Sequence, residues 1–548
     1  HVARAGLATQ ARLCVDMLQQ GRGMAWVVRN RDELLTARAL MRLFSPELSS
    51  GDFLPDALDK GGWTSLPPFS PRSANREGWT ERLSALYALR SGHAKGLILT
   101  ADNLLPKLVP LDFFENREVT LIRGEDVSLD MILEQAVEWG YERVSMVSNP
   151  GEIARRGDIL DIMPPGYDKP IRLDFFGDLI EEIRLFDPVS QRSKANLSEV
   201  RVLPVSPIRQ SPADQAKMQA RWKSLFQKNM LTENERFGLT RLQEQGDFRL
   251  LPGCCYDTAT NLEAWLPADT VWVLPGLSDF RDMLSSAERL WTEAFEAQDV
   301  EGRPQPQRLA MREASDVESA CERFACVHAE PLVMGIAKGI HDLPERSLSS
   351  FEDLFPSTAE QDRPWQTLVQ ALKRWQNDKR QTILCFASEK SRTKFLNLAS
   401  QDGLSPLLRY SGEQHGLFAL VAPFRAGAEL IWDQSLILGE DLLQPHAEKS
   451  RRVPTGAFKG LDRYDELKPG DLLVHRDYGI ARFGGLLRME TGSTANDFLL
   501  LHYSGDDRLY VPVDRLSLIQ RFKGGGEAQP SLDRLGGGAW QSGKEKTR

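Results

Sequence analysis

The sequence predicts a multidomain α/β protein. A parallel-sheet domain is interrupted by an inserted β-rich α+β domain, and a second α/β domain and a small β-barrel follow. Three patterns support this prediction. Short apolar strands are followed by a polar residue and a helix in four places, which is the rhythm of a parallel sheet. Period-two alternation fills the stretch between the second and third of these units. Near the C-terminus, short strands recur about every 8–12 residues with glycines between them.

The four strand–helix units set the domain boundaries. Their strands are AWVV (25–28), GLILT (96–100), VWVLP (271–275) and TILCF (382–386). Asp32, Asp102, Ser278 and Ser388 follow them where a helix N-cap would stand. We assign the chain as follows: residues 1–117 and 203–318 to the first α/β domain, 118–202 to the insertion, 319–441 to the second α/β domain, 442–464 to a linker, 465–523 to the barrel, and 524–548 to a flexible connector.

Composition excludes several classes of protein. The 548 residues are 41% apolar and 26% charged, as in an ordinary globular protein. A net charge of −9 argues against a chain that coats nucleic acid over its whole surface. No apolar run approaches the roughly 20 residues of a membrane span. Six cysteines are too few for a disulfide framework. We therefore expect a cytoplasmic protein.

Motifs for nucleotide and metal chemistry fail on inspection. GAWQSGKE (538–545) has the spacing of a phosphate-binding loop, but Glu545 replaces the hydroxyl that would hold magnesium. Cys321, Cys326 and His328 lie close together, but a zinc site takes four ligands. We interpret these residues as packing residues. The sequence thus predicts no catalytic, cofactor-binding or metal-binding residue.

The stretch GEIARRGDILDIMPPGYDKPIRLDFFGD (151–178) contains a fault in its alternation. Ile171, Leu173 and Phe175 fall on one face of a strand, which leaves Phe176 on the polar face with Arg172. One hypothesis is that Phe176 covers a second small core and that the arginines pair with Asp158 and Asp174. The other is an outward-facing protein-binding patch, because aromatic and arginine residues dominate interface hot spots.

Two segments together resemble one protein family. GEIARRGDILDIMPPG…PIRLDFFGDLIEEIRLFDPVSQRS resembles the second domain of the excision-repair protein UvrB. It resembles more closely the matching domain of bacterial transcription-repair coupling factors (the Mfd family). GDLLVHRDYGIARFGGLLRME…LHYSGDDRLYVPVDRLSLIQRF is similar to the RNA-polymerase-interacting domain of those factors, an SH3-like barrel also found in CarD proteins. UvrB lacks the barrel and CarD proteins lack the UvrB-like region, so the combination is specific.

The resemblance implies roles for named residues. In the family the insertion binds UvrA, the damage-recognition subunit. The contact residues fall on Arg156, Arg172 and Phe176 when GE-x-A-x-RG and RLDFF are matched. ARAGLATQAR (3–12) stands where UvrB has its phosphate loop, without G-K-T. The first α/β domain therefore resembles a motor domain that serves as a scaffold.

The resemblance also implies that the barrel binds the RNA polymerase β subunit through a strand edge. The candidate contact residues are Leu486, Leu487, Arg488 and Met489, which follow the bend at Gly484 and Gly485. An exposed strand edge can extend a partner's sheet through main-chain hydrogen bonds. The alternative is that the three apolar residues fill the barrel core. Alternation cannot bury both Leu486 and Leu487 on one face.

The function implied is that of an adaptor in transcription-coupled nucleotide excision repair. It would bind stalled RNA polymerase with the barrel and recruit UvrA with the insertion. The segment itself is not expected to be an enzyme. ATP, Mg²⁺ and most DNA contacts belong to the motor of the full-length family, an ATP-dependent DNA translocase. One rival is a UvrB-like excision helicase, which predicts DNA-stimulated ATPase activity. The other is a CarD-like transcription regulator, which predicts no UvrA binding.

Overall fold

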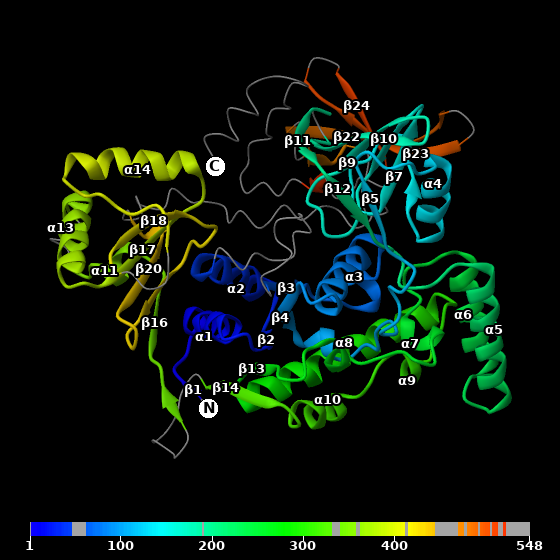
Figure 1. Ribbon diagram of the computed structural model, residues 1–548, viewed down its shortest axis with the longest axis horizontal. Helices are drawn as coiled ribbons and strands as arrows, with labels where there is room; N and C mark the ends of the chain where they lie inside the picture. The colour runs from blue at the N-terminus through cyan, green and yellow to red at the C-terminus, as the bar shows by residue number, and fades with distance from the viewer. Residues whose placement is uncertain are drawn as a thin grey trace. The chain divides into compact units, whose positions relative to one another are not determined.

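The computed structural model is mixed α/β, with one parallel sheet and several β-rich sheets, as the sequence predicts (Figure 1). The chain forms two compact units, His1–Pro445 and His446–Arg548. The structure describes residues 2–45, 62–188, 191–330, 340–357, 362–410, 415–443, 470–475, 479–491, 494–504, 507–512 and 519–521. No helix in these ranges is both long and apolar enough to span a lipid bilayer.

The first unit is built on a seven-stranded sheet with the order β15-β1-β14-β13-β2-β4-β3. All neighbouring strands in it run parallel. The strands are β1 (Val2–Ala3), β2 (Met24–Val28), β3 (Gly62–Leu66), β4 (Ala94–Thr100), β13 (Val271–Pro275), β14 (Ala325–Glu330) and β15 (His341–Asp342). The apolar runs predicted as strands in the first three strand–helix units are therefore confirmed as β2, β4 and β13.

Helices pack on both faces of this sheet. Helices α1 (Leu7–Gln19) and α2 (Arg31–Phe44) share one core with it. Helices α3 (Arg76–Arg90) and α8 (Leu277–Val300) share another. The other helices described in this part are α5 (Pro212–Gln227), α6 (Glu233–Glu244), α7 (Pro252–Cys255), α9 (Gln307–Ala310) and α10 (Ala314–Cys321), with 3-10 turns η2 (Pro71–Ser73), η3 (Ala101–Leu104) and η4 (Leu262–Trp265).

The predicted helix caps are right in one case out of four. Ser388 caps its helix, accepting a hydrogen bond from the Ser391 N–H at 3.1 Å. Asp32, Asp102 and Ser278 instead lie inside the first turn of their helices. The observed N-caps there are Asn30, Thr100 and Gly276. Carboxylates in the first turn still favour the helix through its dipole, so sequence pattern alone does not separate the two positions.

The predicted boundary at residue 319 falls inside the first sheet. β14 pairs with β13, and β15 pairs with β1, although both strands follow residue 319 in the chain. The predicted second α/β domain therefore gives its first strands to the sheet of the first domain. The error arose because the run from 325 to 330 is only partly buried and carries a histidine and a glutamate, so it lacks the apolar signature of the other strands.

The insertion forms a six-stranded sheet, β11-β10-β9-β8-β7-β6, and a two-stranded sheet, β12-β5. Helix α4 (Leu129–Glu138) begins after Ser128, as predicted, and packs on one face of the larger sheet. The strands are β5 (Val119–Ile122), β6 (Glu142–Arg143), β7 (Glu152–Arg156), β8 (Ile159–Ile162), β9 (Ile171–Phe176), β10 (Leu179–Phe186), β11 (Ser193–Leu197) and β12 (Glu199–Val202).

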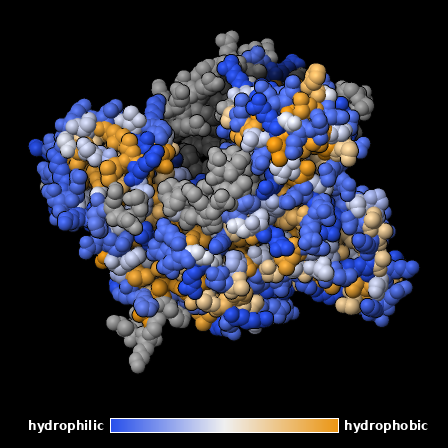
Figure 2. All heavy atoms as spheres, in the orientation of Figure 1, coloured by the Kyte–Doolittle hydropathy of each residue, from blue (hydrophilic) through white to orange (hydrophobic). Residues whose placement is uncertain are grey.

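A second α/β layer follows in the same unit. Its sheet has the order β16-β19-β20-β17-β18, with β17 parallel to β18 and β20. Its elements are β16 (Glu345–Leu348), α11 (Phe351–Leu354), α13 (Pro364–Asn377), β17 (Gln381–Phe386), α14 (Glu389–Gln401), β18 (Leu417–Val421), β19 (Gly427–Leu430), β20 (Ser435–Gly439) and η5 (Glu440–Leu442). Figure 2 shows apolar side chains gathered between α13 and α14.

This second sheet shares a hydrophobic core with the first. Ile383, Phe418 and Ile437 from its strands join the cluster that contains residues of α1 and α2. Helices α1 and α2 therefore lie between the two sheets, as Figure 1 shows. The two α/β domains are consequently packed against each other through a common pair of helices.

The second unit contains a five-stranded antiparallel sheet with the order β24-β23-β22-β21-β25. The strands are β21 (Leu472–His475), β22 (Gly479–Thr491), β23 (Thr494–His502), β24 (Arg508–Pro512) and β25 (Ile519–Arg521). The register of β22 shifts between Phe483 and Gly485, and Gly485 has φ of +123°. A bend at this glycine, as predicted, is therefore confirmed. The segment GAWQSGKE (538–545), which has the spacing of a phosphate-binding loop, and the predicted connector (524–548) lie outside the described residues.

Candidate functional site

The larger sheet of the insertion has one apolar face and one charged face. Ile171, Leu173 and Phe175 of β9 are buried in the core under α4. The opposite side is here called the charged face. Its residues from the central strands are Arg156, Asp161, Arg172, Asp174, Phe176 and Arg184. The predicted alternation of β9 is thus confirmed, and Phe176 stands on the charged face.

Two short turns place Arg156 and Phe176 at the same end of the sheet. Each is the last residue of its strand and is followed by a Gly-Asp turn, with Gly157 at φ +63° and Gly177 at +66°. Glycine adopts this left-handed conformation without steric cost. Strands β7 and β9 both run antiparallel to β8, which lies between them. Arg156 is level with Asp174 across the sheet. Two strand spacings and two residues along β9 therefore separate the Cα atoms of Arg156 and Phe176, roughly 12 Å.

A buried carboxylate lies between the two arginines. Asp161 stands directly opposite Arg172 in the register of β8 and β9 and is 0% exposed. The Nε of Arg172 donates to Oδ1 of Asp161 at 2.7 Å, and Nη2 donates to Oδ2 at 2.9 Å. Arg156 also donates to Oδ2 of Asp161. One carboxylate therefore binds both candidate arginines.

Arg172 is further fixed on its remaining sides. Its Nη2 also donates to Oε1 of Gln191 at 3.1 Å. The guanidinium carbon lies 4.5 Å from the ring centroid of Phe186, within cation–π range. The hydrogen bonds to Asp161 raise the pKa of Arg172 above its ordinary value, so it stays charged. We expected Arg172 to face outward, but its side chain is only 15% exposed because these partners surround it.

The pairing expected under the packing hypothesis is wrong. The partner of Arg172 and Arg156 is Asp161, whereas Asp174 binds Arg184. Arg155 points to the other face and pairs with Asp130 of α4. These ion pairs follow the alternation of the strands, because residues on one face can reach only neighbours on that face.

Phe176 does not cover a second core. It is 73% exposed, which is among the highest values for a large apolar residue in the described chain. Scattered exposed apolar residues are common. This one shares the end of the charged face with a half-exposed arginine, Arg156, and aromatic and arginine residues together are the composition of an interface hot spot.

The candidate polymerase-binding strand is described only through its backbone. The side chains of Leu486, Leu487, Arg488 and Met489 lie outside the described residues. β22 pairs with β21 over 479–482 and with β23 over 482–491. Among the described strands, none pairs with the other edge of β22 after Gly485. A free edge at this position is what strand addition to a partner sheet needs.

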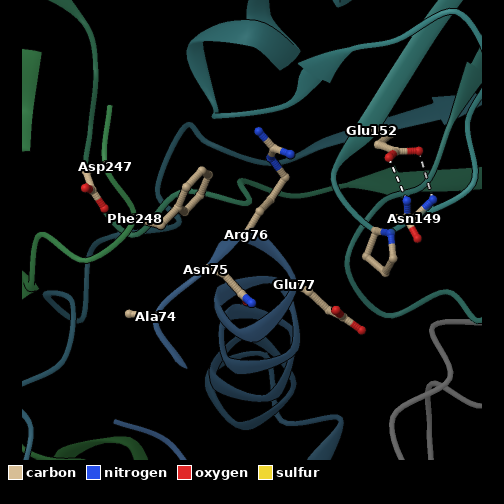
Figure 3. A pocket seen from close by; sticks show the side chains of 9 residues that line it. Ala74, Asn75, Arg76, Glu77, Asn149, Glu152, Asp247 and Phe248 are labelled. Atoms are coloured by element: carbon tan, nitrogen blue, oxygen red, sulfur yellow. Dashed lines mark hydrogen bonds between the residues drawn. The ribbon is translucent and has the colours of Figure 1, made fainter. Parts of the chain in front are cut away.

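A polar pocket of about 420 Å³ lies where the insertion meets the first α/β domain. Figure 3 shows Arg76 at the start of α3 extending between Phe248 and the segment that carries Asn149 and Glu152. The Arg76 guanidinium lies 5.2 Å from the Phe248 ring centroid and pairs with Glu142. Glu152 accepts from the Asn149 side chain and from main-chain N–H groups. Because these groups bind each other, we interpret the pocket as part of the contact between the insertion and the first α/β domain.

A carboxyl group of the protein itself occupies the start of α1. Gly6 is the N-cap of α1, and the Glu345 carboxylate of β16 accepts hydrogen bonds from the main-chain N–H groups of Thr9 at 2.7 Å and Ala8 at 3.4 Å. A Cβ on Gly6 would meet this carboxylate at 2.4 Å. Helix N-termini of this kind bind phosphate in nucleotide sites. Here the position is occupied by a side chain of the protein itself.

No metal centre is found in the described ranges. His, Cys, Asp and Glu side chains there do not form a cluster that could hold an ion. Burial raises the pKa of Cys321 to about 12 and also raises the pKa of Cys326. Thiols held in the protonated form are poor metal ligands.

Sequence reasoning missed Asp161, Gln191 and Phe186. The signal for Asp161 was present in GDILDI, where the carboxylate lies between Leu160 and Ile162 and so on the opposite face from both. Only strand pairing reveals that this face is the one that carries Arg172. Gln191 and Phe186 come from a loop and from the end of β10, beyond the reach of any spacing rule.

Comparisons with known proteins agree with the two segments singled out above. Residues 119–207 match the family described as the UvrB interaction domain, and residues 467–523 match the CarD-like/TRCF RID domain. The chain is 29% identical over 531 residues to the transcription-repair-coupling factor of Myxococcus xanthus, covering 88% of this chain and 42% of that protein. The Escherichia coli (strain K12) factor is 28% identical over 516 residues, covering 88% and 42%. The Staphylococcus aureus (strain MSSA476) factor is 25% identical over 490 residues, covering 86% and 41%. The chain spans about two fifths of the length of these curated relatives.

Proposed function

We propose that this chain, similar over most of its length to bacterial transcription-repair-coupling factors, is an adaptor with two protein-binding ends. One end is the charged face of the insertion, which binds UvrA. The other is the sheet of the second unit, which binds RNA polymerase through its β subunit. Together they would recruit nucleotide excision repair to a stalled polymerase in the cytoplasm.

The observation that carries the proposal is the patch formed by Phe176 and Arg156. An aromatic ring that is 73% exposed and an arginine held by a buried carboxylate lie at the same end of the charged face. Rigid aromatic and arginine anchors of this kind supply most of the energy in protein interfaces. The patch lies in the segment that matches the UvrB interaction domain.

At the other end, we propose that Leu486, Leu487, Arg488 and Met489 of β22 contact the polymerase. The support is the backbone pairing, which among the described strands leaves one edge of this segment open. Such an edge supplies main-chain hydrogen bonds to a partner strand, and its side chains supply specificity. We further propose that the five strands belong to an SH3-like barrel.

We propose that this segment has no ATPase activity of its own and that the first α/β domain is a scaffold. The support is the missing G-K-T in ARAGLATQAR together with the Glu345 carboxylate at the start of α1. A carboxylate there repels phosphate. ATP, Mg²⁺ and DNA translocation would belong to the part of the relatives that this chain does not span.

A bridging assay tests the proposal. Immobilised RNA polymerase should retain UvrA when this chain is added and should lose UvrA when the chain is left out. Two variants separate the ends. Phe176→Ala should release UvrA while the chain stays on the polymerase, and Met489→Arg should release both. If the parent chain stays on the polymerase but does not retain UvrA, the adaptor function is rejected and a transcription regulator is favoured.

A further inference from the structure

Asp161 is unusual because it is fully buried on a face that is otherwise exposed. The carboxylate is 0% exposed, although its strand neighbours on the charged face include Arg156, with a side chain 47% exposed. Both of its carboxylate oxygens accept hydrogen bonds from the guanidinium groups of the two arginines. A buried charge without partners is very costly, so the arginines and the aspartate depend on one another.

The two arginines differ in how much they leave for a partner protein. Arg172 uses Nε and Nη2 on Asp161 and Gln191 and lies over the ring of Phe186. Arg156 has one described hydrogen bond from its guanidinium group, to Asp161. Most of the five donors of its guanidinium therefore remain available for acceptors on a partner. Arg172 forms the base of the patch, and Arg156 presents donors to the outside.

Arg156 needs an anchor because of its place in the fold. It is the last residue of β7, next to a Gly-Asp turn, and nearly half of its side chain is in solvent. A free arginine side chain samples many rotamers, and fixing it on binding costs roughly 1.5–2 kcal/mol. Asp161 fixes one end of the guanidinium before the partner arrives. The conformational entropy of this side chain is then lost on folding and not on binding, which strengthens binding.

We propose that Asp161 is a positioning residue for UvrA recognition, which holds Arg156 and Arg172 in the geometry that the partner requires. This inference rests on the proposed function, because it assigns a role within the same patch. Asp161 itself is fully buried and does not touch the partner. It acts through the arginines, and above all through Arg156.

The test uses the full chain and purified UvrA. Asp161→Asn keeps the size of the side chain and removes its charge, and we expect the dissociation constant to rise about tenfold. The matched control is Asp130→Asn. Asp130 of α4 pairs with Arg155, which lies on the opposite face of the sheet from the patch. The control should change the dissociation constant by less than about twofold.

A double-mutant cycle separates positioning from simple loss of stability. If Asp161 acts through Arg156, then Asp161→Asn should have little further effect in an Arg156→Ala background. A general weakening of the sheet would instead lower binding by the same factor in both backgrounds. Equal effects in the two backgrounds, or an unchanged constant for Asp161→Asn, would overturn the inference while UvrA binding by the parent chain still supports the proposed function.

A second variant covers the case in which Asp161→Asn does not fold. The pair Asp161→Asn with Arg172→Gln removes both charges and leaves two amides that can bind each other. We expect this variant to fold and to bind UvrA at least as weakly as the single change, because Arg156 has still lost its anchor. Wild-type affinity for the pair would overturn the inference. A parent chain that does not bind UvrA at all would overturn the proposed function and this inference with it.

Discussion

Replacing Phe176 with alanine should abolish most UvrA binding without unfolding the insertion. The residue is 73% exposed and is the last residue of β9, so its ring makes little contact with the core. Substitutions of exposed side chains outside the core, helix caps and buried polar networks usually change stability by less than about 0.5 kcal/mol. The unfolding transition of the variant should therefore match that of the parent chain.

The expected loss of affinity follows from the exposed area of Phe176. A phenylalanine can bury roughly 200 Å², and 73% of that is still exposed before binding. Covering about 150 Å² at ~25 cal/mol per Å² is worth ~3.5 kcal/mol. Alanine retains part of this, and ordering the ring costs part of it. We expect a net loss of about 2 kcal/mol, which raises the dissociation constant ~30-fold.

Calorimetric titration of UvrA into the chain measures this change directly. The matched control is Phe237→Ala on α6, since that phenylalanine is 66% exposed but lies outside the insertion. The control should leave the dissociation constant unchanged. A Phe176→Ala variant that binds within threefold of the parent would refute the reasoning, and so would an equal loss in the control.

Three further outcomes are expected. Arg172→Glu places a second negative charge against buried Asp161, so the free energy of unfolding in denaturant should fall by about 3 kcal/mol; an unchanged midpoint would contradict the buried pair. Met489→Arg should abolish polymerase retention while circular dichroism stays that of the parent, and an insoluble variant would instead show a core role. Burial opposes ionisation of Glu429, but Arg380 and Arg346 outweigh it and lower its pKa below the ordinary 4.5. Its stabilisation is therefore present above pH 4.5 and lost as pH falls through the folded-state value. The melting temperatures of Glu429→Gln and the parent should differ at neutral pH and converge as the pH falls below 4.5, and a constant difference would contradict this.

The alternation of side chains was the most informative part of the sequence. It assigned Ile171, Leu173 and Phe175 to the core and left Phe176 outside, and the structure confirms each placement. Period two is a local property of one strand, so it survives without knowledge of the rest of the fold. The same holds for the runs that became β2, β4 and β13, whose residues are apolar because both faces of a parallel sheet are covered.

Properties that depend on pairing could not be predicted. Asp158 and Asp174 are near Arg172 in sequence or on the same strand, yet the partner is Asp161, which the register of β8 brings opposite it. The boundary at residue 319 failed for a related reason. β14 is recognised as part of the first sheet only through its neighbour β13, 54 residues earlier in the chain, as the register of Trp272 with Cys326 shows. Strand neighbours are set by tertiary structure, and a single sequence does not contain them in readable form.

The carboxylate of Glu345 at the start of α1 bears on how this part of the chain can be divided. β15 lies at the edge of the first sheet, and Glu345 accepts a hydrogen bond from the first turn of α1. β16 begins at Glu345 and belongs to the second sheet. A cut between β15 and β16 would therefore separate α1 from its Glu345 acceptor. Because the two sheets also share the core around α1 and α2, we expect the two α/β domains to unfold together.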